Sequence, residues 1–264
     1  GYLDTKGLEA VVNFSPIYKP GERIVWTIGY TGSIYKSKYG NFNNTLASLN
    51  TAQLNSNSLV RYQDGYSPDD LWAVPSKGID PATGREVFVK KNGEYTFVYD
   101  PADIVKSGSG TPLIEGVIST SFTYKGASLG IYLRYVLGRD IFNDVLYSKV
   151  ENISFQGLSE NQDKRALYDR WQKPGDNARF KGISLTSTTP ISSRFIQEEN
   201  SLSGESINMG YRFDQKIWLK KVGISSLTLN AYMNDLFYFS TVKRERGIDY
   251  PYAKSFSFSL NASF

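Results

Sequence analysis

Apolar and small polar residues alternate one by one over the last residues of the chain. From position 256 on, the even positions carry Phe256, Phe258, Leu260, Ala262 and Phe264, and every position between them carries serine or asparagine. A period of two residues is the period of a β-strand that has one apolar and one polar face. The pattern therefore predicts a strand over residues 252–264.

The same alternation predicts six earlier strands, at residues 8–18, 23–35, 114–124, 128–137, 206–213 and 226–233. Lys19-Pro20-Gly21 is a turn signal, so the first two strands form a hairpin. In the first strand we expect Tyr18 to share the apolar face with Leu8 and Phe14. Pro16 is expected near the end of this strand, because proline cannot donate a hydrogen bond to a β-ladder.

Two long polar stretches, at about 36–112 and 139–200, interrupt the periodicity. Inside the first, Asn92-Gly93 stands between two apolar runs, and this pair predicts a small β-hairpin. Inside the second, the sequence predicts a short helix near residues 161–171. Stretches of this length without regular structure are candidates for binding or other function.

The long and short connections fall at opposite ends of the predicted strands. The connections at 36–112, 139–200 and 237–251 lie at one end, and those at 19–22, 125–127 and 214–224 lie at the other. Barrels of the outer membrane sort their loops in this way, with short periplasmic turns and long extracellular loops. A last strand that finishes on an aromatic residue, as at Phe264, is also typical of such barrels.

The composition of the two strand faces favours the same interpretation. One face is large and apolar, and the other is mainly Ser, Thr, Asn and Gly with few charges. A soluble sheet would place Lys and Glu on its exposed face. Lipid suits the apolar face, and a watery or plugged lumen suits the small polar one. We predict an all-β fold, a transmembrane antiparallel β-barrel; a soluble β-rich protein is the alternative.

Seven strands do not close into a bacterial barrel, because these barrels have even strand numbers. An open edge in lipid would leave backbone groups without hydrogen bonds. Two interpretations follow. The chain is a small eight-stranded barrel with a structural, adhesion or hydrolase role, in which the strand at 8–18 pairs with that at 252–264. Alternatively, it is the C-terminal part of a larger barrel.

Composition excludes several function classes. The chain has 264 residues without histidine or cysteine, which removes the commonest general base, the commonest metal ligand and thiol chemistry. We therefore expect no enzyme, and no catalytic residue or cofactor. Asp64, Asp69 and Asp70 lack the spacing of a calcium loop, so no metal site is expected. The net charge of +4 is too small to indicate a nucleic-acid-binding protein. No apolar stretch is long enough for a transmembrane helix.

A set of short motifs in fixed order resembles the C-terminal part of SusC/RagA-type TonB-dependent outer-membrane transporters. The set comprises G-I-D-P-A-T-G-R-E at 78–86, R-W-Q-K-P-G-D at 170–176, S-R-F-I-Q-E-E at 193–199, N-D-L-F at 234–237, and the Y-P…S-F…F terminus at 250–264. The fourth motif departs from the family pattern, because Asp235 is inserted in it. The two strands before residue 78 fit by pattern alone.

The resemblance implies that residues 1–264 are about seven C-terminal strands of a roughly 22-stranded barrel with a plugged lumen. No counterpart of the plug domain or of the TonB-contacting segment is expected in this chain. The implied partners are an N-terminal barrel and plug polypeptide, a SusD-like surface lipoprotein, TonB acting through the plug, and outer-membrane lipids. The implied function is import of oligosaccharides or peptides across the outer membrane of a Gram-negative bacterium.

Candidate functional residues lie on both faces and in the loops. On the polar face the candidates for substrate contact, or for pairing with the plug, are Arg134, Arg212, Asn230 and Tyr232. In the long loops Trp72 and Trp171 are candidates for stacking on a sugar, or for packing within the loops. On the apolar face of the terminal strand, Phe256, Phe258, Leu260 and Phe264 are expected to meet lipid.

Overall fold

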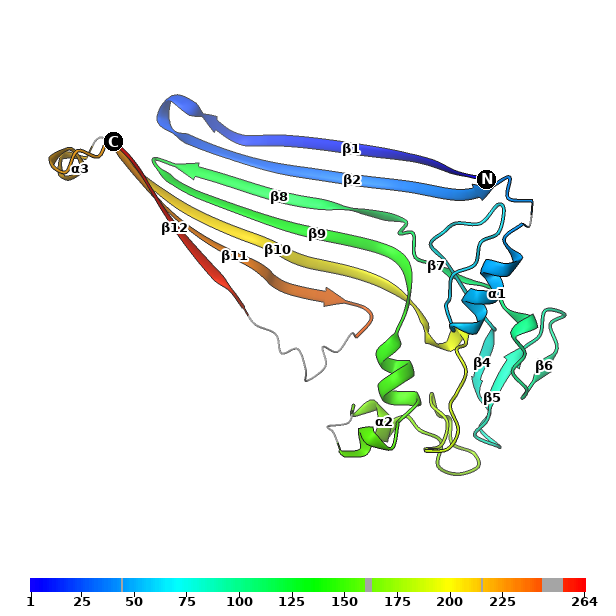
Figure 1. The fold of residues 1–264 in the computed structure, drawn as a ribbon. Helices are drawn as coiled ribbons and strands as arrows, with labels where there is room; N and C mark the ends of the chain where they lie inside the picture. Colours follow the sequence, from blue (N-terminus) through cyan, green and yellow to red (C-terminus); the bar gives the residue numbers. More distant parts are fainter. Residues whose placement is uncertain (44, 160–162, 215, 244–253) are drawn as a thin grey trace.

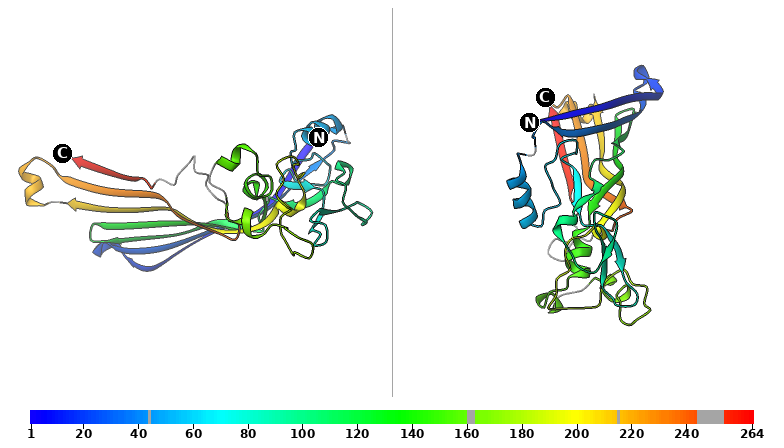
Figure 2. Two further views of the ribbon diagram at one scale, coloured as in Figure 1. Left: turned by 90° about the horizontal axis from the view of Figure 1, so that it is seen from below. Right: turned by 90° about the vertical axis from the view of Figure 1, so that its right-hand side faces the viewer.

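Seven long strands form one antiparallel sheet in the order β1-β2-β8-β9-β10-β11-β12 (Figure 1). The computed structural model describes residues 1–43, 45–159, 163–214, 216–243 and 254–264. The strands are β1 (Tyr2–Lys19), β2 (Ile24–Gly40), β8 (Ile114–Tyr124), β9 (Ala127–Phe142), β10 (Ile196–Asp214), β11 (Ser226–Ser240) and β12 (Phe256–Ser263). The strands fan out, and the sheet twists rather than lying flat (Figure 2).

The register confirms that one face of this sheet is apolar across all seven strands. Residues that stand directly opposite each other in an antiparallel pair point to the same face. Along one row, Trp26 is opposite Phe122, and Phe122 is opposite Leu129. Further rows join Leu129 to Met209, Met209 to Ala231, and Ala231 to Phe258. The intervening rows carry the small polar residues, so the alternation read from each strand aligns between strands.

Tyr18 is an exception, and the prediction for its face was wrong. Pairing with β2 shifts between Phe14 and Ile17, so a β-bulge lies at Ser15-Pro16. Beyond it, Ile17 is opposite Trp26 on the apolar face, and Tyr18 is on the polar face. Bulges are one of the few places where a sheet accepts proline, and the extra residue exchanges the two faces.

The inserted Asp235 also lies at a bulge. Ser206 is opposite Asn234 and Gly204 is opposite Phe237, so both strands carry extra residues here. Asp235 has φ 52°, a left-handed conformation that aspartate tolerates better than most residues. The strand continues past the insertion to Ser240.

Short elements fill the long connections, which gather at one end of the sheet (Figure 1). The connection from β2 to β8 contains α1 (Ala47–Asn55), β3 (Asp70–Ala73), β4 (Ser76–Ile79), β5 (Glu86–Val89), β6 (Tyr95–Thr96), the 3-10 turn Pro101–Asp103 and β7 (Val105–Ser109). Strand β3 pairs with β7, and β4, β5 and β6 form a second small sheet. The hairpin predicted around Asn92-Gly93 is therefore confirmed as β5 and β6.

The connection from β9 to β10 is mainly irregular. It contains the π-helix Leu146–Glu151, α2 (Arg165–Tyr168), and 3-10 turns at Gln156–Ser159 and Ser193–Phe195. The helix predicted near 161–171 is thus four residues long, and residues 160–162 lie outside the described part. At the other end of the sheet, the turns are the 3-10 turn Pro20–Glu22, Lys125-Gly126, and α3 (Ile217–Lys221). Residues 244–251 of the connection predicted at 237–251 lie outside the described residues.

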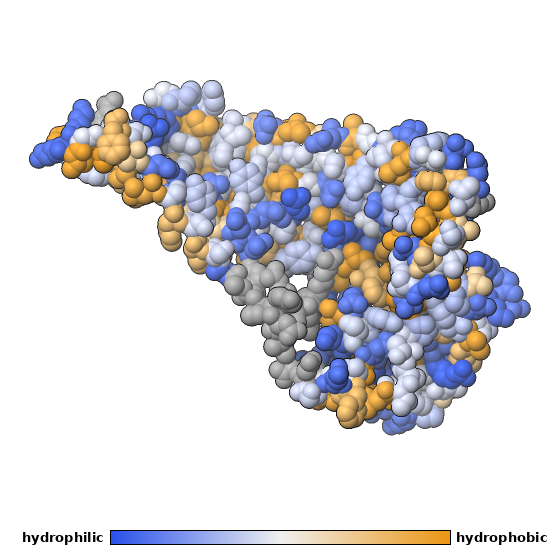
Figure 3. Space-filling view, viewed as in Figure 1, coloured by the Kyte–Doolittle hydropathy of each residue, from blue (hydrophilic) through white to orange (hydrophobic). Residues whose placement is uncertain are grey.

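Among the described residues, a hydrophobic core cluster lies in the long connections at one end of the sheet. Leu146, Val150, Ala166, Phe180 and Phe195 are buried together at the long-loop end. By contrast, the apolar face of β12 is open, and the side chain of Phe258 is 80% exposed. Pale and blue residues cover much of the sheet in the view of Figure 3. None of the helices in the described part is long and apolar enough to cross a membrane.

Strands β1 and β12 form the two edges of the sheet. In the described part of the chain, β1 pairs with β2 and β12 pairs with β11, and neither pairs with the other. This arrangement contradicts the eight-stranded alternative, which required pairing between residues 8–18 and 252–264.

Candidate functional site

The polar face of the sheet brings three of the predicted candidates into one area. Arg212 of β10 is opposite Thr228 of β11, and the next polar rows bring Asn230 and Tyr232. The Asn230 amide donates to Ser259 Oγ on β12 at 3.1 Å. The phenol of Tyr232 is on the same face, with its side chain partly exposed. These residues offer guanidinium, amide and phenol groups to anything that lies against the sheet.

Small residues keep this face open. A Cβ atom on Gly210 would lie 2.6 Å from Ser128 Oγ and 2.7 Å from Asn230 Oδ1. One on Gly130 would lie 2.6 Å from Asn208 Oδ1. Glycine at these positions lets the neighbouring polar side chains lie flat along the sheet, so the surface stays close to the backbone.

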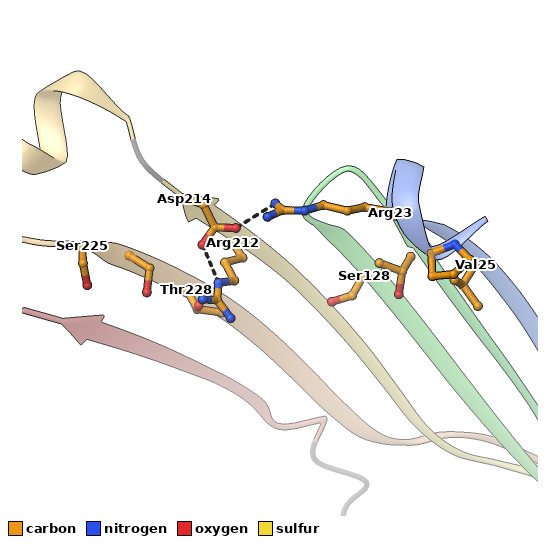
Figure 4. Close-up of a pocket in the computed structure, with 11 residues that line it drawn as sticks. Arg23, Val25, Ser128, Arg212, Asp214, Ser225 and Thr228 are labelled. Carbon is orange, nitrogen blue, oxygen red and sulfur yellow. Dashed lines mark hydrogen bonds and ion pairs between the residues drawn. The ribbon is translucent and has the colours of Figure 1, made fainter. Parts of the chain in front are cut away.

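A cavity of about 1000 Å³ is present on the polar face at the short-turn end (Figure 4). Two arginines at its wall share one carboxylate. Arg23 Nη1 lies 2.8 Å from Asp214 Oδ2, and Arg212 Nε lies 2.6 Å from Asp214 Oδ1. Both arginine side chains are about 60% exposed, whereas Asp214 is mostly covered. Two cations with one anion leave this wall with a positive charge facing the cavity.

Backbone geometry places Arg23 at this site. It follows the 3-10 turn Pro20–Glu22 and has φ 59°, and its amide donates to the carbonyl of Pro20. This left-handed residue closes the β1–β2 turn and starts β2 on its polar face. Neither Arg23 nor Asp214 was among the candidates predicted from the sequence; the available signal was a carboxylate two residues after Arg212.

Arg134 lies apart from the other polar-face candidates. Its Nε is 3.2 Å from Glu205 Oε1, and both side chains are partly exposed. Glu205 is the extra residue at the β10 bulge, between the paired residues Gly204 and Ser206. The carboxylate partner expected for such an arginine is therefore supplied by this chain.

The two tryptophan candidates pack against other loop residues. Trp72 in β3 is 7% exposed, and its ring centroid lies 4.8 Å from that of Tyr66. The Trp171 Nε1 donates to the carbonyl of Pro81 at 2.8 Å. A Cβ on Gly84, whose φ is +69°, would lie 2.5 Å from the Trp171 ring. Trp171 therefore packs the motif at 170–176 against the motif at 78–86.

The Asp80 and Asp176 carboxylates stabilise these two motifs locally. Asp80 accepts from the Thr83 hydroxyl at 2.6 Å, and this bond is the main reason that its pKa is lowered. Asp176 accepts from the backbone amides of Lys173 and Gln172, which lower its pKa. Each aspartate closes its own turn, so both have a structural role that the motif pattern alone did not show.

A buried ionic cluster joins the two long loops, and sequence reasoning missed it. Arg194 Nη2 lies 2.6 Å from Glu151 Oε1 and 3.0 Å from Glu86 Oε2, and Glu86 also accepts from the Ser192 hydroxyl. Glu151 is fully buried, and Glu86 and Arg194 nearly so. Burial opposes the charged guanidinium, but hydrogen bonds to Glu151 and Glu86 outweigh it and raise the Arg194 pKa.

Residues from three of the quoted motifs meet at this cluster. Glu86 ends the first motif, Arg194 belongs to the third, and Arg170 of the second donates to the backbone carbonyl of Glu151 at 3.3 Å. They meet although about 108 residues separate Glu86 from Arg194. In the described part of the chain no group of acidic residues is arranged to hold a metal ion.

Comparisons with known proteins agree with this architecture. No protein-family model matches the sequence. The TonB-dependent receptor P39 of Formosa agariphila is 27% identical over 164 residues, which are 60% of this chain and 15% of that receptor. Its name describes a receptor and not an enzyme.

Solved structures of the RagAB peptide importer have the same fold. The open-open state matches with a TM-score of 0.75 and 18% identity over 99% of this chain, and the closed-closed state with 0.73 and 17% over 99%. This chain spans 29% and 30% of the matched chains. The sheet therefore has the fold of part of the β-barrel in these importer structures, and the chain is similar in sequence to part of a TonB-dependent receptor.

Proposed function

We propose that this chain forms the C-terminal wall of a TonB-dependent outer-membrane transporter that imports oligosaccharides or peptides. The observation that supports it most is the continuous division of the seven-stranded sheet into an apolar face and a small-residue polar face. Lipid covers the apolar face, including Phe256, Phe258, Leu260 and Phe264. The polar face lines the lumen, and the long loops are extracellular.

Other strands complete the barrel at the free edges of β1 and β12. An edge in lipid leaves unpaired N–H and C=O groups, each of which costs several kcal/mol. The proposed partners are a polypeptide segment that carries the remaining strands and the plug, through which TonB acts, and a SusD-like lipoprotein over the loops. The name of the structurally similar RagAB importer specifies peptides, which supports testing peptides first.

The polar-face candidates have two proposed roles. The arginine pair around Asp214 lies at the periplasmic end, where its excess positive charge suits a carboxylate of the plug. Asn230 and Tyr232 lie higher in the lumen and suit contact with cargo. Trp72 and Trp171 remain candidates at the extracellular end, although both pack within the loops.

The test is isolation of the complex from outer membranes through a tag in an extracellular loop of this chain. Mass spectrometry of the intact complex is expected to show the remaining strands and plug, on the same or a second polypeptide, and a lipoprotein. Labelled peptides and labelled oligosaccharides are then supplied to cells with and without TonB. Uptake of one of them should require both TonB and this chain. A folded, monodisperse species of these 264 residues alone would contradict the proposal.

A further inference from the structure

The outward face of the β1–β2 hairpin changes from apolar to basic at one register row. Leu8 is opposite Ile34 in the last apolar row, and the next row pairs Lys6 with Lys36. The row after that pairs Asp4 with Lys38. Residues of one strand face alternate by two, so all of these side chains continue the face that carries the apolar residues below them.

The inner face of the same rows has the opposite character. Ser37 is buried, and its hydroxyl lies 2.9 Å from that of Thr5. Lys36 and Lys38, on either side of it, are exposed. The loops therefore cover the inner side of this hairpin end, and the lysines project outward, away from the lumen.

Two like charges directly opposite each other in a β-pair are destabilising unless something compensates for them. Lys6 has a partner in Asp4, at 3.2 Å. Lys36 and Lys38 have no ion pair with any residue that the structure describes. Three lysines and one aspartate leave this patch with an excess positive charge that no other residue in the described ranges neutralises by an ion pair.

The height of the patch fits the headgroup layer of a membrane. From Ile24 to Ile34 the β2 strand rises about ten residues, and a strand tilted about 40° gains about 2.5 Å of height per residue, so this span covers about 25 Å. That is the height of the apolar band of an outer-membrane barrel. Lys36 and Lys38 lie just above it, at the extracellular end, and Tyr2 packs across Gly40 at the same level.

We propose that Lys6, Lys36 and Lys38 form a binding site for the phosphate groups of an anionic lipid of the outer leaflet, such as a phosphorylated glycolipid. The inference rests on the proposed orientation in the outer membrane. The apolar rows below hold the acyl chains, and the ammonium groups meet the phosphates. Lysine is a mobile point charge, which suits a headgroup without a fixed orientation.

The test measures binding of fluorescent bis-phosphorylated lipid A to the complete transporter in a neutral detergent. Each basic residue near an anionic lipid surface contributes about fivefold in affinity, so Lys36→Gln/Lys38→Gln is expected to weaken binding about 25-fold. Asp4→Asn releases Lys6 and should strengthen binding about fivefold. The matched control, Lys91→Gln/Lys173→Gln, changes two exposed loop lysines and should leave affinity unchanged.

Two further arms separate the sources of phosphate and the two proposals. Dephosphorylated lipid A should bind as weakly to the wild type as lipid A does to the double variant; equal affinity for both lipids would overturn the inference. Full competition by millimolar inorganic phosphate would also overturn it, because a free-anion site would then suffice. Insertion of the wild type into neutral vesicles tests the proposed function by itself, and its failure would overturn both proposals.

Discussion

Replacement of Arg194 by leucine tests whether the buried cluster holds the two long loops together. The guanidinium has three carboxylate contacts, at 2.6, 3.0 and 3.2 Å, and also donates to the carbonyl of Arg179. Its removal leaves the buried Glu86 and Glu151 carboxylates without the guanidinium that pairs with both of them. Breaking a buried ion pair in this way costs about 3–5 kcal/mol. We expect this loss to appear as local opening of the loop unit, because the sheet itself makes no contribution to the cluster.

Hydrogen exchange of the intact protein in detergent measures this opening directly. A loss of 3–5 kcal/mol lowers amide protection by roughly two to four orders of magnitude if exchange follows local opening. The effect should be confined to the amides of the segments that carry the cluster, Glu86–Val89, Leu146–Glu151 and Ser193–Phe195. The control is Arg179→Leu, since the Arg179 side chain is exposed, and its expected effect is near zero.

A triple variant distinguishes loss of charge balance from loss of packing. Glu86→Gln and Glu151→Gln added to Arg194→Leu remove all three charges, and protection should largely return because buried ionic groups are often replaceable as a set. A fall in protection of less than tenfold in Arg194→Leu would refute the reasoning. So would a triple variant that is no better protected than the single one.

Three other predictions concern lipid contact, pH and the motif contact. Phe258→Arg places a charge about midway along the apolar band and should destabilise the inserted transporter by about 2–4 kcal/mol in lipid unfolding assays, whereas Ser257→Arg on the polar face should change it little. The lowered pKa of Asp176 means that its stabilisation of the turn is present at neutral pH and is lost as pH falls below the usual aspartate range; Asp176→Asn should remove this acid sensitivity in local amide exchange. Gly84→Ala should displace the Trp171 ring, seen as a red-shifted and quenched indole emission relative to the wild type; an unchanged spectrum would contradict the contact.

The alternation of residues predicted the strands well wherever pairing is regular. It failed at bulges, because a bulge exchanges the two faces and breaks the period of two. The bulge at Pro16 moved Tyr18 to the polar face. Bulges near Asn200 and Glu205 interrupt the alternation in the first half of β10, which was therefore not predicted. The bulge at Asp235 had the same effect on the end of β11.

The ionic cluster was beyond sequence reasoning for a different reason. Glu86 and Arg194 lie in stretches without periodicity, and no local rule relates two residues that are so far apart in sequence. The motifs that contain them were recognised as an ordered set, but the order of motifs along a sequence does not say which of their residues are in contact. Similarly, the strand order decides which turns are neighbours at the end of the sheet, and the Arg23–Asp214 pair depends on that order.

The long-loop cluster has a consequence for how the sheet reaches its correct register. A slip of two residues between neighbouring strands preserves the apolar and polar faces, and the rows of similar residues would penalise it only weakly. The same slip moves the base of a loop by about 7 Å, which is far more than the reach of the bonds among Glu86, Ser192 and Arg194. The ionic cluster between the loops therefore depends on the strand register. Strands that pair two residues out of register keep the cluster from forming, so the cluster forms only when the sheet is in its native register.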